Sequence, residues 1–291
     1  MGNEKLGFIV TLISASSFGA MGIFAKIAYN FNLNTTTILT FRFLIAAIIL
    51  WTYLWFKKDY TPIKRGKLYQ LIIVGTIGYG LVSVFYFSCV KLASASLAGL
   101  LLYLHPILVY LTLLFLKQDA FAWKKVLALI ISFTGLIFVL GSSFKTTNLL
   151  GILAGLGSAF AYTFYIVAGT KVMKEIKPLQ GTVIVITSTA ATYLLLGLIK
   201  SQLILPKAAA AYLWMFLIAI ISTVLAISLF WIGVSLIGPT NASIISTIEP
   251  LVTVILAFIF LKEKLTISQT LGGILIISGV VILKTIGNKT C

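Results

Sequence analysis

Long apolar segments separated by short polar ones run through the whole sequence. A helix that crosses a bilayer needs roughly 20 mostly apolar residues. Segments of this length lie at about 6–28, 34–56, 67–90, 93–116, 121–141, 148–172, 178–199, 210–236, 240–261 and 266–286. The alternation of apolar and polar residues that marks the strands of a membrane barrel is absent. The pattern therefore predicts an all-α membrane protein with ten transmembrane helices.

The composition agrees with this pattern. Of the 291 residues, 60% are hydrophobic and only 10% are charged, whereas soluble domains carry about 25% charged residues. Apolar runs recur from one end to the other, which favours an integral membrane domain over a soluble domain with an anchor. Two cysteines, Cys89 and Cys291, show neither metal-ligand spacing nor a disulfide framework.

The net charge of +16 comes from basic residues scattered between the apolar segments. They form no continuous basic face or arm, so nucleic acid is not an expected partner. If the spans alternate in direction, fourteen Lys and Arg residues lie on the side of the membrane that holds the N-terminus, and seven lie on the opposite side. Arg42, inside a span, completes the 22. Because basic loops stay on the cytoplasmic side, we expect a multi-pass protein of the cell membrane with both termini in the cytoplasm.

The sequence repeats itself at an offset of 144 residues. HPILVYLTLLFLKQDAF (105–121) falls on EPLVTVILAFIFLKEKL (249–265) without a gap, which pairs Pro106 with Pro250 and Asp119 with Glu263. We therefore expect two five-helix units, residues 1–144 and 145–291. Because five is odd, the second unit enters the membrane from the opposite side, and such inverted repeats are typical of alternating-access transporters.

Residues 86–116 and 235–266, YFSCVKLASASLAGLLLYLHPILVYLTLLFL and SLIGPTNASIISTIEPLVTVILAFIFLKEKLT, resemble the paired EamA repeats of the drug/metabolite transporter superfamily. The resemblance covers nearly the whole chain. It implies a ten-helix secondary carrier of the cytoplasmic membrane, often an exporter of amino acids or other small metabolites. It also implies a central cavity walled by the first, third, fourth, sixth, eighth and ninth helices.

Glu249 is the one acid inside a predicted span, and its repeat-mate His105 is the one histidine of the chain. Both lie near mid-depth, where an ionisable side chain is costly and usually faces a cavity or a partner. Each is followed by a proline, which frees a backbone carbonyl one turn earlier and predicts a kink beside a polar pocket. Glu249 either binds substrate or a proton, or is a protonated structural residue; His105 either contributes to the site or is a neutral core residue.

Arg42 has two interpretations. Its guanidinium could bind a carboxylate or phosphate of the substrate, and together with Glu249 it could hold both ends of an amino acid. It could instead hold helices together through backbone carbonyls. The resemblance favours the structural role, since the family often carries an arginine at this place whatever the substrate.

Further candidates for substrate binding are aromatic and hydroxyl side chains at the depth of the expected cavity. Packing is the commoner role of a single aromatic residue, so their assignment depends on the helices that the family uses around its cavity. They are Phe18 and its repeat-mate Tyr162, then Tyr79, Ser83 and Tyr86 on one face of the third span, and Trp231 on the eighth.

The leading functional prediction is a secondary transporter, an exporter of a small polar metabolite such as an amino acid, that works by alternating access. Its expected partners are that substrate and membrane lipid, with proton coupling left open; no cofactor is expected. A channel or facilitator is the alternative that the sequence leaves open. An intramembrane enzyme is disfavoured, because HExxH and GxSxG motifs are absent and a single histidine forbids a two-histidine metal site.

Overall fold

The computed structural model describes residues 2–58, 60–93, 95–141, 148–262 and 265–284, and within these ranges it contains helices and no strand. Ten helical stretches within these ranges are long and apolar enough to cross a membrane, which confirms the number and the approximate position of the expected spans. The spans, in order, are α1 (Gly2–Tyr29); α2 (Thr35–Lys57); α3 (Arg65–Ile73), η1 (Val74–Tyr79) and α4 (Gly80–Leu92); α5 (Ala95–Leu102) and α6 (His105–Phe115); α7 (Trp123–Leu140); α8 (Leu149–Met173); α9 (Pro178–Ile199); α10 (Ala209–Ala219), η3 (Ile220–Leu225) and α11 (Ala226–Ile237); α12 (Pro239–Ser246) and α13 (Glu249–Leu261); and α14 (Ile267–Lys284).

The fourth and ninth spans are each broken in two at repeat-related positions. α5 ends at Leu102 and α6 begins at His105, while α12 ends at Ser246 and α13 begins at Glu249. A proline stands at the second position of both α6 and α13, where it has no amide proton to continue the preceding helix. The kinks expected from Pro106 and Pro250 are therefore present, and each places an ionisable side chain at its centre.

The third and eighth spans each contain a π-helical segment. The first, η1, covers Val74–Tyr79 and the second, η3, covers Ile220–Leu225. These segments occupy corresponding places in the two five-helix units. A π segment widens the helix and releases backbone carbonyls, and such segments are frequent at functional sites.

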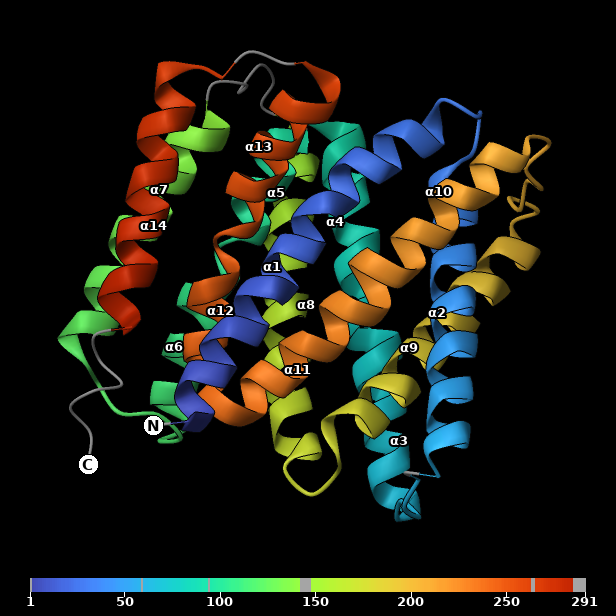
Figure 1. Ribbon diagram of the computed structural model, residues 1–291, viewed down its shortest axis with the longest axis horizontal. Helices are drawn as coiled ribbons and strands as arrows, with labels where there is room; N and C mark the ends of the chain where they lie inside the picture. The colour runs from blue at the N-terminus through green and yellow to red at the C-terminus, as the bar shows by residue number, and fades with distance from the viewer. Residues whose placement is uncertain (1, 59, 94, 142–147, 263–264, 285–291) are drawn as a thin grey trace.

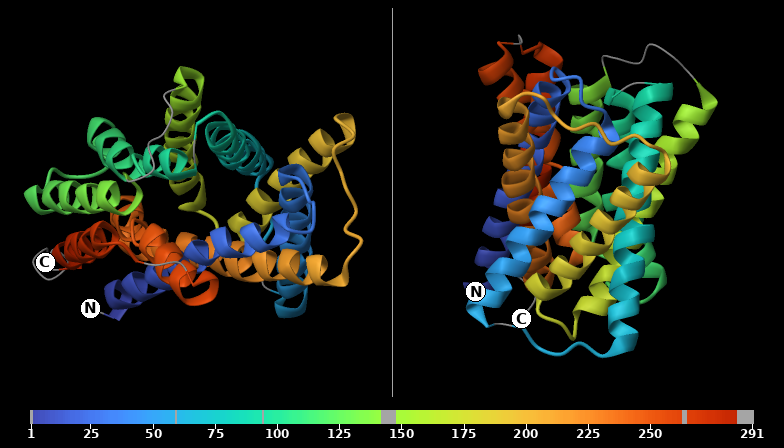
Figure 2. Two further views of the ribbon diagram at one scale, coloured as in Figure 1. Left: turned by 90° about the horizontal axis from the view of Figure 1, so that it is seen from above. Right: turned by 90° about the vertical axis from the view of Figure 1, so that its right-hand side faces the viewer.

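Two helices pack as a pair at one lateral edge of the bundle. α7 and α14 run side by side there (Figures 1 and 2). An added Cβ at Gly135 would come within 2.6 Å of the carbonyl oxygen of Gly272, so glycine at this crossing permits backbone contact. Apolar side chains such as Phe115 and Ile267 point outward and are strongly exposed, as expected of a surface covered by lipid.

α1 crosses the second half of the chain closely and positions the broken ninth span. Its Ser14 hydroxyl donates to the Ala226 carbonyl of α11 at 2.6 Å. At Gly19 an added Cβ would lie 2.8 Å from the backbone oxygen of Glu249. The Thr253 hydroxyl of α13 closes this contact by donating to the Gly19 carbonyl at 2.9 Å. The small residues of α1 thus let it hold the start of α13 in place.

Candidate functional site

Glu249 lies at the start of α13, near the middle of the ninth span, which covers Pro239–Phe260. Its side chain is half-buried. The Tyr103 hydroxyl, from the break in the fourth span, is within hydrogen-bonding reach of its carboxylate. As the first residue of a helix, Glu249 places its charge at the positive end of the α13 dipole, which is electrostatically favourable.

Four tyrosines surround this carboxylate closely enough to interact with it electrostatically: Tyr79, Tyr86, Tyr103 and Tyr162. They come from the third, fourth and sixth spans. Tyr86 and Tyr162 are half-buried, like Glu249, whereas Tyr79 and Tyr103 are buried. The residues thus form an aromatic shell around a single acid, and we refer to Glu249 with these four tyrosines as the central site.

His105 lies beside the central site, with its ring 4.4 Å from that of Tyr162 between centroids. Its Nδ1 is 3.1 Å from the carbonyl oxygen of Leu102. A carbonyl only accepts, so Nδ1 carries the proton in this arrangement and Nε2 keeps its lone pair. Nε2 is buried and has no hydrogen-bond partner among the residues that the structure describes.

Arg42 is buried, 4% exposed, and its guanidinium joins both halves of the chain. Nε donates to the Thr223 hydroxyl at 2.6 Å and Nη2 to the Ser222 carbonyl at 3.1 Å, both in η3. Nη2 also reaches the Tyr79 hydroxyl at 3.4 Å, at the end of η1. Arg42 therefore bridges the two π segments, because a carbonyl released in η3 accepts one of its protons.

The other side chains that the sequence suggested for substrate binding are buried around this site and packed or hydrogen-bonded within the protein. Trp231 donates from Nε1 to the Tyr165 hydroxyl at 2.7 Å, and Tyr165 in turn packs on Tyr79 with 4.9 Å between ring centroids. Phe18 belongs to the same buried apolar cluster. The Ser83 hydroxyl is directed to the Tyr79 carbonyl of its own helix at 3.4 Å. These side chains shape the surroundings of the central site.

Sequence reasoning missed Tyr103 and Tyr165. Tyr103 stands two residues before His105, inside the break of the fourth span, and Tyr165 follows Tyr162 by three residues and shares its helix face. The position of each tyrosine relative to a named candidate could have been read from the sequence. Within the described part of the chain, no three His, Cys, Asp or Glu side chains gather in a way that could hold a metal ion.

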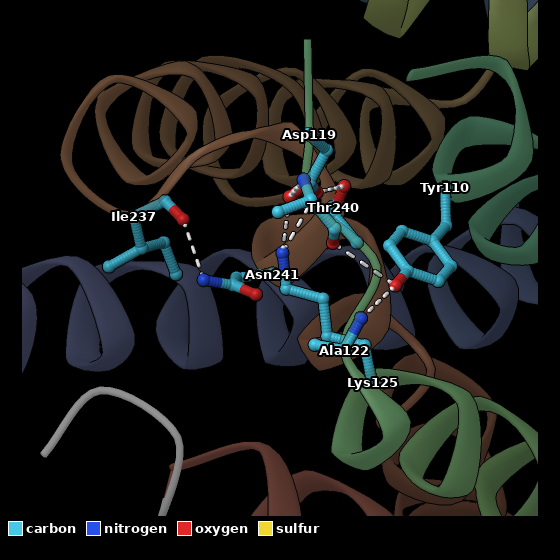
Figure 3. Close-up of polar contacts among 8 residues, drawn as sticks. Tyr110, Asp119, Ala122, Lys125, Ile237, Thr240 and Asn241 are labelled. Carbon is cyan, nitrogen blue, oxygen red and sulfur yellow. Dashed lines mark hydrogen bonds and ion pairs between the residues drawn. The ribbon is translucent and has the colours of Figure 1, made fainter. Parts of the chain in front are cut away.

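A polar network connects the two halves at the end of the bundle where α1 begins. In the loop between α6 and α7, Asp119 pairs with Lys125 at 2.7 Å. The Thr240 hydroxyl, at the start of α12, donates to the same carboxylate at 2.6 Å (Figure 3). Tyr110 holds the loop by accepting the Ala122 amide proton at 2.8 Å. We call the contact between Asp119 and Thr240 the N-side latch.

Burial of the Asp119 carboxyl would raise its pKa, but the hydrogen bonds from Lys125 and Thr240 outweigh this effect. The pKa of Asp119 is therefore held below its usual value. Its repeat-mate Glu263, predicted to mark the same place after the ninth span, lies outside the described residues.

A pocket of about 370 Å³ opens at the same end of the bundle, between the start of α1 and the ends of α11 and α14. Lys5, Phe8, Asn241 and Lys284 are among its lining residues, and Glu249 is not. It is a feature separate from the central site.

Comparison with known proteins identifies the architecture. Residues 5–141 and 149–285 each match the EamA-like transporter family. The chain belongs to this family. The two matches correspond to two copies of the family unit in one chain, in agreement with the ten spans and the broken helices. Membership of a transporter family also argues against an enzyme.

Relatives of similar length are transporters by name. The chain is 26% identical to an uncharacterized inner membrane transporter, YicL, of Salmonella typhimurium, over 97% of this chain and 96% of the relative. It is 25% identical to the uncharacterized transporter YcbK of Bacillus subtilis, over 91% and 88%. A solved crystal structure shares the fold with a TM-score of 0.85 at 17% sequence identity, covering 97% of this chain and 98% of that one. The protein is therefore a membrane transporter of the EamA type.

Proposed function

We propose that the protein is a secondary carrier that exports a small polar metabolite, an amino acid being one example, by alternating access through the central site. The observation that carries this proposal is the pair of breaks at His105 and Glu249. Broken helices near the membrane midplane, at the interface of two repeats, are where transporters of this architecture bind their substrates. Glu249 is proposed to bind the substrate or a coupled proton.

The N-side latch fits the closed side of such a cycle. Asp119 and Thr240 belong to different repeats, so their hydrogen bond holds the two halves together at the end where α1 begins. With the termini in the cytoplasm, as the basic residues favour, the N-side latch closes the cytoplasmic entrance.

Counterflow in proteoliposomes tests the carrier proposal. Purified protein is first screened by thermal shift against amino acids, amines, nucleobases and sugar phosphates, and a stabilising compound is then used as labelled substrate. A carrier takes up label faster when unlabelled substrate is present inside, because the loaded carrier returns more readily. Uptake that is indifferent to substrate on the opposite side favours the channel or facilitator instead.

Glu249→Gln tests the role of the acid, because it keeps the shape of the side chain and removes its charge. We expect the variant to fold and to lose counterflow or the dependence of counterflow on a pH gradient. Glu175→Gln is the matched control, since Glu175 is an exposed acid paired with Lys67 at 3.1 Å and far from any span centre. Wild-type transport by a folded Glu249→Gln protein, with an unchanged pH profile, contradicts the proposed role.

A further inference from the structure

Arg42, the one arginine that could bind a substrate carboxylate inside the spans, is already engaged. Its Nε and Nη2 donate to Thr223 and to Ser222, and its Nη1 lies 2.9 Å from the sulfur of Met21. The guanidinium also lies over the ring of Phe43, 4.8 Å from its centroid. With these partners, the guanidinium of Arg42 has no free pair of neighbouring N–H groups that could bind both oxygens of a carboxylate.

Beside the tyrosine hydroxyls, the central site and the adjacent His105 offer two acceptors with bonding capacity. An ionised carboxylate has about four lone-pair positions, and within the described ranges the side chain in hydrogen-bonding reach of Glu249 is that of Tyr103. His105 adds a second acceptor, because its Nδ1 faces a carbonyl and its buried Nε2 has no partner in the described part of the chain. A buried acceptor without a donor is unfavourable, so both groups favour a ligand rich in N–H donors.

The aromatic shell favours the same kind of ligand. The rings of Tyr162 and Tyr165 are stacked, with centroids 5.7 Å apart and an angle of 8° between planes. Tyr79 meets Tyr162 edge-on at 6.4 Å. Tyrosine faces carry the negative part of the ring quadrupole and therefore attract a cation.

We propose that the central site selects a small organic cation with a primary ammonium group over a zwitterionic amino acid with the same side chain. The ammonium group donates to Glu249 and to His105 Nε2 and lies against the tyrosines. The carboxylate of an amino acid would meet Glu249 while the guanidinium of Arg42 is already engaged by other groups, and like charges repel. This inference rests on the proposed function and narrows its substrate class.

Matched ligand sets test the inference on the unmodified protein. Phenethylamine, phenylalanine and 3-phenylpropionate share a ring and differ in charge; butylamine, norvaline and pentanoate repeat the comparison with a short aliphatic chain. Binding to protein in nanodiscs is measured by calorimetry. We expect an amine of at least one set to bind tenfold or more tightly than its amino acid, and the carboxylates not to bind.

Glu249→Gln supplies the second measurement. We expect the preference for the amine to fall to about twofold or less, while Glu175→Gln keeps the wild-type ratio. The inference is overturned if an amino acid binds as tightly as its amine, or if no amine of either set binds. Counterflow of an amino acid that depends on Glu249 would overturn the amine selectivity and leave the carrier proposal standing. Binding of an amine without counterflow would support the amine selectivity and contradict the carrier proposal.

Discussion

Thr240→Val removes the hydrogen bond of the N-side latch and little else. The Thr240 side chain is 2% exposed and its hydroxyl donates to Asp119 Oδ2 at 2.6 Å. Valine has nearly the same shape, so packing at the start of α12 is retained. The ion pair between Asp119 and Lys125 also remains, because its two nitrogen–oxygen contacts of 2.7 and 2.8 Å do not involve Thr240.

The expected magnitude follows from the charge and the exposure of the acceptor. A hydrogen bond to a charged group contributes about 1.5–3 kcal/mol. The Asp119 side chain is 18% exposed, so water replaces part of the lost bond in the variant and the lower end of this range applies. At about 1.4 kcal/mol per factor of ten, the variant should increase the population that is open on the N side roughly tenfold.

Cysteine labelling measures this population. Ser243 lies one helical turn beyond Thr240 in α12, is fully buried, and donates to the Pro239 carbonyl of its own helix. In a background with Cys89 and Cys291 replaced, a cysteine at Ser243 should react with a polar maleimide only when the N side opens. When the open state is the minor one, the labelling rate is proportional to its population, so we expect a rise of about tenfold in Thr240→Val.

Thr170→Val is the matched control, because the Thr170 hydroxyl is half-buried and donates only to the Ile166 carbonyl of its own helix. Its labelling rate should equal that of the parent protein. If folded Thr240→Val labels at the parent rate, the contact between Asp119 and Thr240 is a local loop contact and does not hold the N side closed.

Three further outcomes are expected. The ionised Asp119 carboxylate stabilises the folded protein above about pH 4. Because its pKa is lowered in the folded state, this stabilisation is lost as the pH falls through that lower pKa. The Tm difference between the wild type and Asp119→Asn should therefore shrink between pH 6 and pH 3. Gly169→Ala should lower stability by about 1–3 kcal/mol, because an added Cβ would overlap the buried indole of Trp231; Gly66→Ala, with open space around the Cβ, should leave the melting temperature unchanged or slightly raised. A reporter that works only in the cytoplasm, fused after Cys291, should be active, and an inactive reporter on a well-expressed fusion would contradict the expected topology.

The scaffold was predictable from the sequence because its signals are local. The ten spans follow from runs of apolar residues, and the breaks at His105 and Glu249 follow from the prolines that come next. The π segments were not predictable, because VGTIGY and IISTVL share neither a proline nor a common pattern. Both segments also contact Arg42 of another span, and a local pattern does not encode such a contact.

The chemistry of the site was predictable only as a set of candidates. The sequence indicated that Arg42 and Glu249 were unusual at their depth, but it left open whether Arg42 binds substrate or holds helices. Its contacts bear on this question, and two of its partners, Ser222 and Thr223, are about 180 residues away along the chain. Propensity and periodicity carry no information about such contacts.

The two repeats have helix breaks and π segments at corresponding places but carry different polar groups there. Tyr79 and Thr223 are repeat-mates, and both contact Arg42, whose own repeat-mate is the apolar Ile186. A single cation therefore joins two equivalent π segments. The same asymmetry holds at the breaks, where the first repeat has a neutral acceptor and the second has the acid.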